Sequence, residues 1–153
     1  MHIRYPLVRS VVAVLAGEAS RLALLVPFGV LVLSPAFDAV GHKPGLPLPD
    51  TSHIRMLVGC FLLWILFVVN PAGGYVAAML APRAYLAHGA ALSILAVLIY
   101  GLEVLSSPPD QMPLPFVIGV FPANIVGILF GAWLYHRRAR RQQRLMSQAA
   151  ALR

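Results

Sequence analysis

Four apolar segments, each long enough to cross a lipid bilayer, constrain this chain more than any other feature. They cover residues 7–33, 56–81, 84–105 and 113–135. A spanning helix needs about 20 mostly apolar residues, because each residue advances it by about 1.5 Å across a hydrocarbon core about 30 Å thick. The sequence therefore predicts an all-α integral membrane domain of four transmembrane helices over residues 1–135, followed by a basic tail over residues 136–153.

Prolines mark the expected ends of these segments. Pro6 and Pro35 bracket the first segment and predict a helix start and a helix stop. Pro82 separates the second segment from the third, which predicts a tight antiparallel hairpin and, with the other connections, an up-down bundle. The first segment continues too far for the hydrophobic region of a signal peptide, so we expect it to remain as a helix.

The composition and charge of the chain favour lipid over nucleic acid as its environment. Of the 153 residues, 59% are hydrophobic and 11% are charged, and the mean hydropathy is +0.80. A soluble domain carries about 25% charged residues. The net charge of +7 is heaviest in the tail, which has no aromatic residue to stack on bases. We therefore expect contacts with anionic lipids and none with nucleic acid.

Basic residues lie mostly on one side of the predicted membrane. That side receives Arg4, Arg9, Arg83, Arg137, Arg138, Arg140, Arg141, Arg144 and Arg153, whereas the other receives Lys43 and Arg55. Short cytoplasmic loops and tails carry an excess of Lys and Arg. The pattern predicts a multi-pass protein of the bacterial cytoplasmic membrane with both termini in the cytoplasm and with the Pro-rich loops 35–52 and 106–115 outside.

Small residues recur at helical spacing in several segments. In the second and fourth segments they are Gly73, Gly74, Ala77 and Ala78, and Gly119, Ala123, Gly127 and Gly131. Gly89 and Gly101 mark a similar face of the third segment. Helices in lipid associate by close packing across such residues. The stripes predict either closure of a compact bundle or, for the fourth helix, docking onto another protein.

A polar group interrupts the first segment. Glu18 and Arg21 are three residues apart, so they share a helix face and can neutralise each other. Asn70 and Asn124 lie at similar depth next to Pro71 and Pro122, whose freed carbonyls their amides could satisfy. We expect an intramembrane cluster of Glu18, Arg21, Asn70 and Asn124. It could lock the bundle, form a proton or ion relay or substrate site, or contact a partner subunit.

Few residues suggest other chemistry. His88 is a weak candidate ligand for a metal or a tetrapyrrole, although a histidine near a helix end more often forms a local hydrogen bond. The chain has no HExxH, CxxC, GxSxG or Walker sequence. We expect no catalytic residue, no metal site and no cofactor of its own, although the chain could contact lipids or pigments of a host complex.

The basic tail is a candidate docking segment. Its arginines (Arg137, Arg138, Arg140, Arg141 and Arg144) follow the fourth segment directly. They favour contact with anionic lipid head groups, and an acidic cytoplasmic partner is the alternative.

Two stretches resemble a loose group of small bacterial four-helix membrane proteins without established activity. They are Arg9-Ser-Val-Val-Ala-Val-Leu-Ala-Gly17 and Gly73-Gly74-Tyr-Val-Ala77-Ala78, the latter followed by a basic turn and His88. The resemblance implies a four-helix integral membrane fold. The chain departs from the group at Glu18-Ala-Ser-Arg21, where apolar residues are expected.

These observations favour a non-catalytic accessory or structural subunit of a larger bacterial membrane protein complex, photosynthetic or respiratory, whose partners are other membrane protein subunits. The alternative is a small transporter or proton-conducting protein that uses Glu18 and Arg21. A lipid-binding membrane protein is a third hypothesis.

Overall fold

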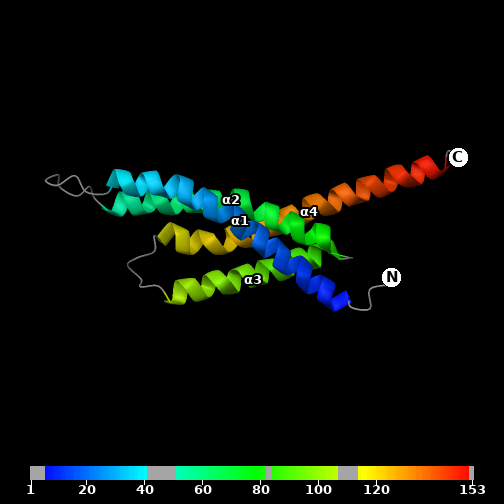
Figure 1. Cartoon of the computed structure of the whole chain (residues 1–153), viewed down its shortest axis with the longest axis horizontal. Coiled ribbons are helices and arrows are strands. Elements are labelled where there is room, and N and C mark those ends of the chain that lie inside the picture. The colour runs from blue at the N-terminus through cyan, green and yellow to red at the C-terminus, as the bar shows by residue number, and fades with distance from the viewer. Residues whose placement is uncertain (1–5, 41–50, 82–83, 107–113, 152–153) are drawn as a thin grey trace.

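Four helices make up the chain. The computed structural model describes residues 6–40, 51–81, 84–106 and 114–151. The helices are α1 (Pro6–Val40), α2 (Thr51–Leu80), α3 (Tyr85–Ser106) and α4 (Leu114–Ala151). Consecutive helices run in opposite directions, and the start of α1 and the end of α4 lie at the same end of the molecule (Figure 1). All four are long and apolar enough to cross a membrane, which indicates a multi-pass membrane protein.

Two predicted helix ends are wrong. α1 continues through Pro35 to Val40, because a proline removes one backbone hydrogen bond and, in a membrane helix, does not by itself end the helix. α4 continues to Ala151, so the tail extends the fourth helix. Residues 136–151 contain neither Gly nor Pro and are rich in Arg, Gln and Ala, which favour helix. α2 also begins earlier than predicted, at Thr51.

Parts of the predicted topology lie outside the described residues. They include most of the two outer loops, with Lys43 and Asp110, and the basic residues Arg4, Arg83 and Arg153. Among the described residues, Arg9 is in the first turn of α1 and five arginines are in the last part of α4.

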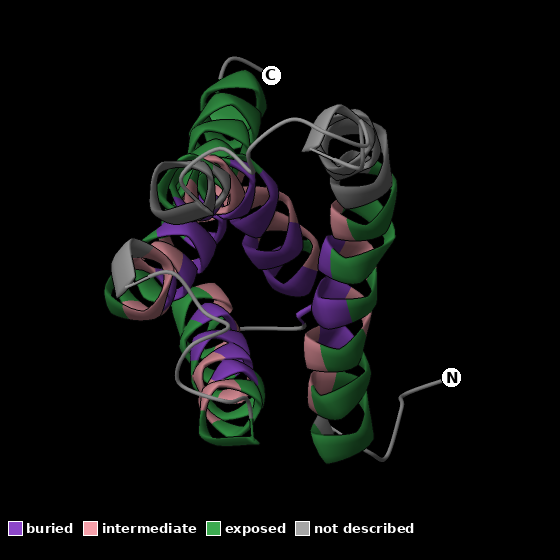
Figure 2. Cartoon of the chain, turned by 90° about the vertical axis from the view of Figure 1, so that its left-hand side faces the viewer, coloured by how far each residue is buried: buried purple, intermediate pink, exposed green. Residues whose placement is uncertain are grey.

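The distribution of polarity is inverted relative to a soluble protein. The buried polar side chains are those of Glu18, Arg21, Asn70, Ser93 and Asn124. The exposed side chains include large apolar ones, among them Trp64, Phe67, Ile94, Leu102 and Phe130. Buried residues face the inside of the bundle and exposed residues face outward (Figure 2). An apolar outer surface of this extent fits contact with lipid. Four of the buried polar side chains, those of Glu18, Arg21, Asn70 and Asn124, bond to one another inside.

Helices α2 and α4 approach until their backbones nearly touch. A Cβ atom placed on Gly74 would lie 1.9 Å from the carbonyl oxygen of Ile128, and one on Gly131 would lie 1.9 Å from that of Pro71. Gly127 likewise faces Asn70. The small-residue stripe of α4 therefore closes the bundle internally, and this face is not free to dock another protein.

The other predicted packing residues divide between two interfaces. Gly119 faces the side chain of Leu63, whereas Gly73 faces the backbone of Gly17 in α1. Ala77 and Ala78 are buried and Ala123 is half-buried. Gly101 differs from the prediction, because nothing lies within 4 Å of the position its Cβ would take. Its spacing matches a packing face, but no helix of the described chain approaches it.

Candidate functional site

An ion pair in α1 forms the centre of the candidate site. Glu18 and Arg21 lie one turn apart, and Arg21 Nη2 donates to Glu18 Oε1 at 2.5 Å. Arg21 is 0% exposed and Glu18 is 7% exposed. The two opposite charges neutralise each other inside the bundle, where an isolated charge would be costly.

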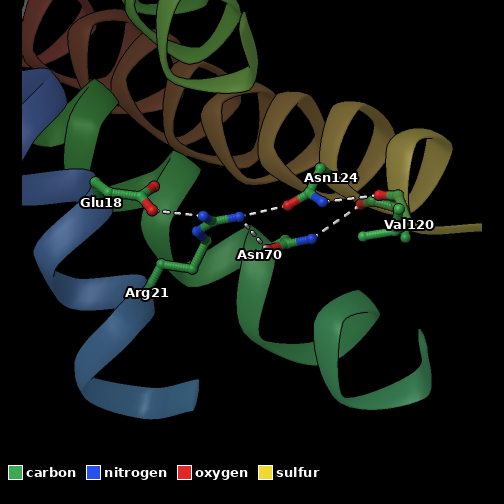
Figure 3. Close-up of polar contacts among 6 residues, drawn as sticks. Glu18, Arg21, Asn70, Val120 and Asn124 are labelled. Atoms are coloured by element: carbon green, nitrogen blue, oxygen red, sulfur yellow. Dashed lines mark hydrogen bonds and ion pairs between the residues drawn. The ribbon is translucent and has the colours of Figure 1, made fainter. Parts of the chain in front are cut away.

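The Arg21 side chain reaches each of the other three helices. Its Nη1 donates to Asn124 Oδ1 in α4 and to Asn70 Oδ1 in α2, the latter at 3.3 Å (Figure 3). Its guanidinium lies 5.4 Å from the ring centroid of Tyr100 in α3, a cation–π contact. The backbones of α1 and α4 make no contact along the described residues. One long side chain therefore connects helices that do not pack directly.

Small neighbours make room for the guanidinium. A Cβ atom on Gly73 would lie 3.2 Å from Arg21 Cβ and 2.9 Å from the Gly17 carbonyl oxygen. Gly17 in turn lies against Ala77 and Leu92. Because α1 and α2 meet through glycines here, Arg21 extends between the helices instead of pushing them apart.

The two asparagines are held in one orientation by carbonyls of α4. Asn70 Nδ2 donates to the Ala123 carbonyl at 3.1 Å, and Asn124 Nδ2 donates to the Val120 carbonyl at 2.7 Å. Their Oδ1 atoms consequently face Arg21 (Figure 3). The sequence predicted that these amides satisfy the carbonyls freed by Pro71 and Pro122, which lie four residues before each proline. The amides instead donate to the carbonyls of Ala123 and Val120, which leaves both Oδ1 atoms as acceptors for the guanidinium.

The cluster is not saturated with hydrogen bonds. Glu18 Oε2 and Arg21 Nε are buried and have no partner among the residues described by the structure. The sequence predicted which four residues would meet, but it missed Tyr100, the contact of Arg21 in α3. The available signal was a tyrosine inside the third apolar segment, five residues before the predicted end at residue 105.

His88 makes a local contact. Its Nδ1 lies 3.1 Å from the Ala84 carbonyl oxygen, one turn earlier. Ala84 has a left-handed backbone with φ 55°, and its carbonyl also accepts from the backbone N–H groups of Ala87 and His88. Across residues 6–40, 51–81, 84–106 and 114–151, no three His, Cys, Asp or Glu residues are grouped as metal ligands would be.

The arginines of α4 divide into two groups. Arg138 Nη1 donates to the Tyr75 hydroxyl at 3.2 Å, and the Arg137 guanidinium lies 5.4 Å from the Trp133 ring. Arg138 therefore contacts α2 at the end of the bundle, whereas Arg137 packs on its own helix. Arg140, Arg141 and Arg144 are exposed and lie on the part of α4 that projects beyond the other helices (Figure 1).

Aromatic rings surround the point at which α4 leaves the bundle. Tyr135 packs edge-on against Tyr75 of α2 and Tyr85 of α3, each with ring centroids 5.3 Å apart. His136 lies against Tyr85 at 5.8 Å. This ring cluster joins three helices and sets the direction of the projecting segment.

Comparison with protein-family models, curated proteins and solved structures gives no match for this chain.

Proposed function

We propose that this chain is a non-catalytic structural subunit of a larger bacterial membrane complex, with both termini in the cytoplasm. The projecting end of α4 carries the proposal. Residues 140–151 continue the helix, and all of them are exposed. In proteins most helical stability comes from tertiary packing, and this segment of about 12 residues packs against nothing in the described chain. A partner that covers this segment would supply the missing packing.

The charge of this segment indicates the kind of partner. Arg140, Arg141 and Arg144 are not balanced by any acidic residue in α4 beyond Tyr135. At about 1.5 Å per residue, Arg144 lies about 14 Å past Tyr135. That distance exceeds the Debye length of about 8 Å at physiological ionic strength, so attraction to lipid head groups is weak at Arg144. Arg140 and Arg141, about 8 and 9 Å past Tyr135, lie at about one Debye length. An acidic surface of a neighbouring subunit fits better, and Arg137 and Arg138 remain near the membrane boundary.

The polar cluster supports a structural role. Arg21 joins four helices through Glu18, Asn70, Asn124 and Tyr100. Each of these contacts joins α1 to another helix or neutralises charge within α1. The rigid bundle thus serves as a base from which the basic segment of α4 projects at a defined angle.

The docking role predicts that neutralising the projecting segment releases the chain from its complex. Arg140→Gln/Arg141→Gln/Arg144→Gln should shift the chain to a smaller species, because the charge that attracts an acidic partner is gone. The matched Lys triple variant retains the charge and should remain in the complex. Mild detergent extraction followed by native sizing and identification of co-purifying chains measures this. A wild-type chain that runs as a solitary monodisperse monomer contradicts the proposal.

Flux through liposomes distinguishes the structural proposal from the transport alternative, in which Glu18 carries protons or ions. We expect purified chain in liposomes to conduct no protons or ions beyond empty liposomes, and Glu18→Gln to leave this unchanged, because Glu18 is held by Arg21 inside the bundle. A fluorescent pH indicator trapped in the liposomes reports proton flux under an imposed gradient. Flux by the wild type that falls in the Glu18→Gln variant would assign transport to this chain.

A further inference from the structure

A cavity of about 360 Å³ lies between the four helices toward the end opposite the projecting part of α4. Its walls are mainly apolar and include Leu22, Leu62, Leu66, Ile99 and Phe116. This volume lies within the range of about 300–1,000 Å³ that small-molecule sites occupy. Such sites combine apolar walls with a few polar groups, and this cavity also has mostly apolar walls and three polar residues.

Three polar residues line the cavity, and they are not equivalent. Arg21 is 0% exposed and its Nη atoms are directed to Glu18, Asn70 and Asn124, so its charge is already neutralised. Tyr100 and Glu103 lie three residues apart on one face of α3. Neither the Tyr100 hydroxyl nor the Glu103 carboxylate bonds or pairs with a side chain among the described residues.

We propose that this cavity binds a lipophilic cation, a molecule with an apolar body and one ammonium or other onium group. The Glu103 carboxylate is the uncompensated charge of the cavity, since Glu18 and Arg21 cancel. An apolar wall lowers the effective dielectric around that carboxylate and strengthens its attraction for a cation. An anionic ligand is repelled by the same group. A neutral chain fills the walls but gains nothing from the carboxylate.

The position of Glu103 suits this ligand. It is exposed, near the end of α3, so a bound molecule places its charged group at the mouth and its apolar body between Leu62 and Phe116. The Tyr100 ring has Arg21 against it, which leaves its hydroxyl as a further polar contact for the head group.

The test uses the full chain in phosphatidylcholine nanodiscs, with dodecyltrimethylammonium as the probe and empty nanodiscs subtracted. We expect saturable binding that Glu103→Gln weakens about tenfold, a loss of about 1.4 kcal/mol, and that Glu103→Asp largely retains. Ile99→Trp should fill the cavity and abolish binding. Leu102→Trp is its matched control, because Leu102 lies on the same helix outside the cavity and is 68% exposed, and binding should be unchanged.

Three results would overturn the proposal. The first is the absence of saturable binding above empty nanodiscs. The second is binding that neither Glu103→Gln nor Ile99→Trp alters. The third is displacement by dodecanol with the same potency as by the cation, which would show a site for acyl chains irrespective of charge. Ile99 and Glu103 are both exposed, so these variants keep the fold, and thermal unfolding checks this.

Discussion

Gly131→Ala should strongly destabilise the bundle, although it adds a single methyl group. The new Cβ would lie 1.9 Å from the Pro71 carbonyl oxygen and 2.7 Å from its carbonyl carbon. Both atoms belong to the backbone of α2 and cannot rotate away as a side chain can. The helices must separate, and this loosens the contacts around Gly74 and between Arg21 and Asn124. We expect a loss of roughly 3 kcal/mol, at the upper end of the range for overpacked sites.

Two further glycines calibrate this result in an unfolding titration with a denaturing detergent, followed by circular dichroism. At Gly119 the added methyl meets the flexible end of Leu63, at 2.6 Å, so Gly119→Ala should cost less. At Gly101 it meets nothing within 4 Å, and Gly101→Ala should be neutral or stabilise the helix by up to about 1 kcal/mol. Equal stability of Gly131→Ala and Gly101→Ala would show that α2 and α4 do not meet through their backbones.

These glycines show what spacing alone predicts and what it leaves open. The four-residue repeat in α4 identified a packing face, because residues at that spacing share one side of a helix. It could not assign partners. Gly73 and Gly74 are adjacent in α2, yet Gly73 faces α1 and Gly74 faces α4. Gly101 has similar spacing and faces no helix. The rotation of each helix about its axis is set by packing against its neighbours, which hydropathy does not describe.

The same limit applies to the polar cluster. Depth along each helix follows from the rise per residue. It predicted Glu18 and Asn124 near the middle of the membrane core, with Asn70 a little nearer the cytoplasmic side. The pairing of Glu18 with Arg21 follows from their spacing in one helix. The contact with Tyr100 depends on the rotation of α3, so it became visible only in the assembled bundle. The apolar segment ends near Tyr135, but α4 continues to Ala151. Apolar content therefore predicts the span of the membrane, whereas helix propensity decides how far the helix continues beyond it.

Arg21→Leu should cost more stability than replacing both members of the ion pair. The single variant leaves the Glu18 carboxylate buried without its cation and removes the donor shared by Asn70 and Asn124. Breaking a buried pair in this way costs about 3–5 kcal/mol. Glu18→Leu/Arg21→Leu removes the unpaired charge as well, leaving only two amide oxygens without a donor. Interhelical hydrogen bonds in membranes contribute about 0.6 kcal/mol each on average, so the double variant should recover a large part of the loss.

Arg21→Lys separates charge from geometry in the same experiment. Lysine keeps the positive charge beside Glu18, but it lacks the planar fork that lets one guanidinium donate to Glu18 and Asn124 at once. It should therefore fall between the wild type and Arg21→Leu in the detergent titration. If Arg21→Leu alone unfolds at the same point as the double variant, or later, then the carboxylate is not stabilised by Arg21. The connection among four helices would then rest on the glycine contacts of α2 and α4 instead of on the guanidinium.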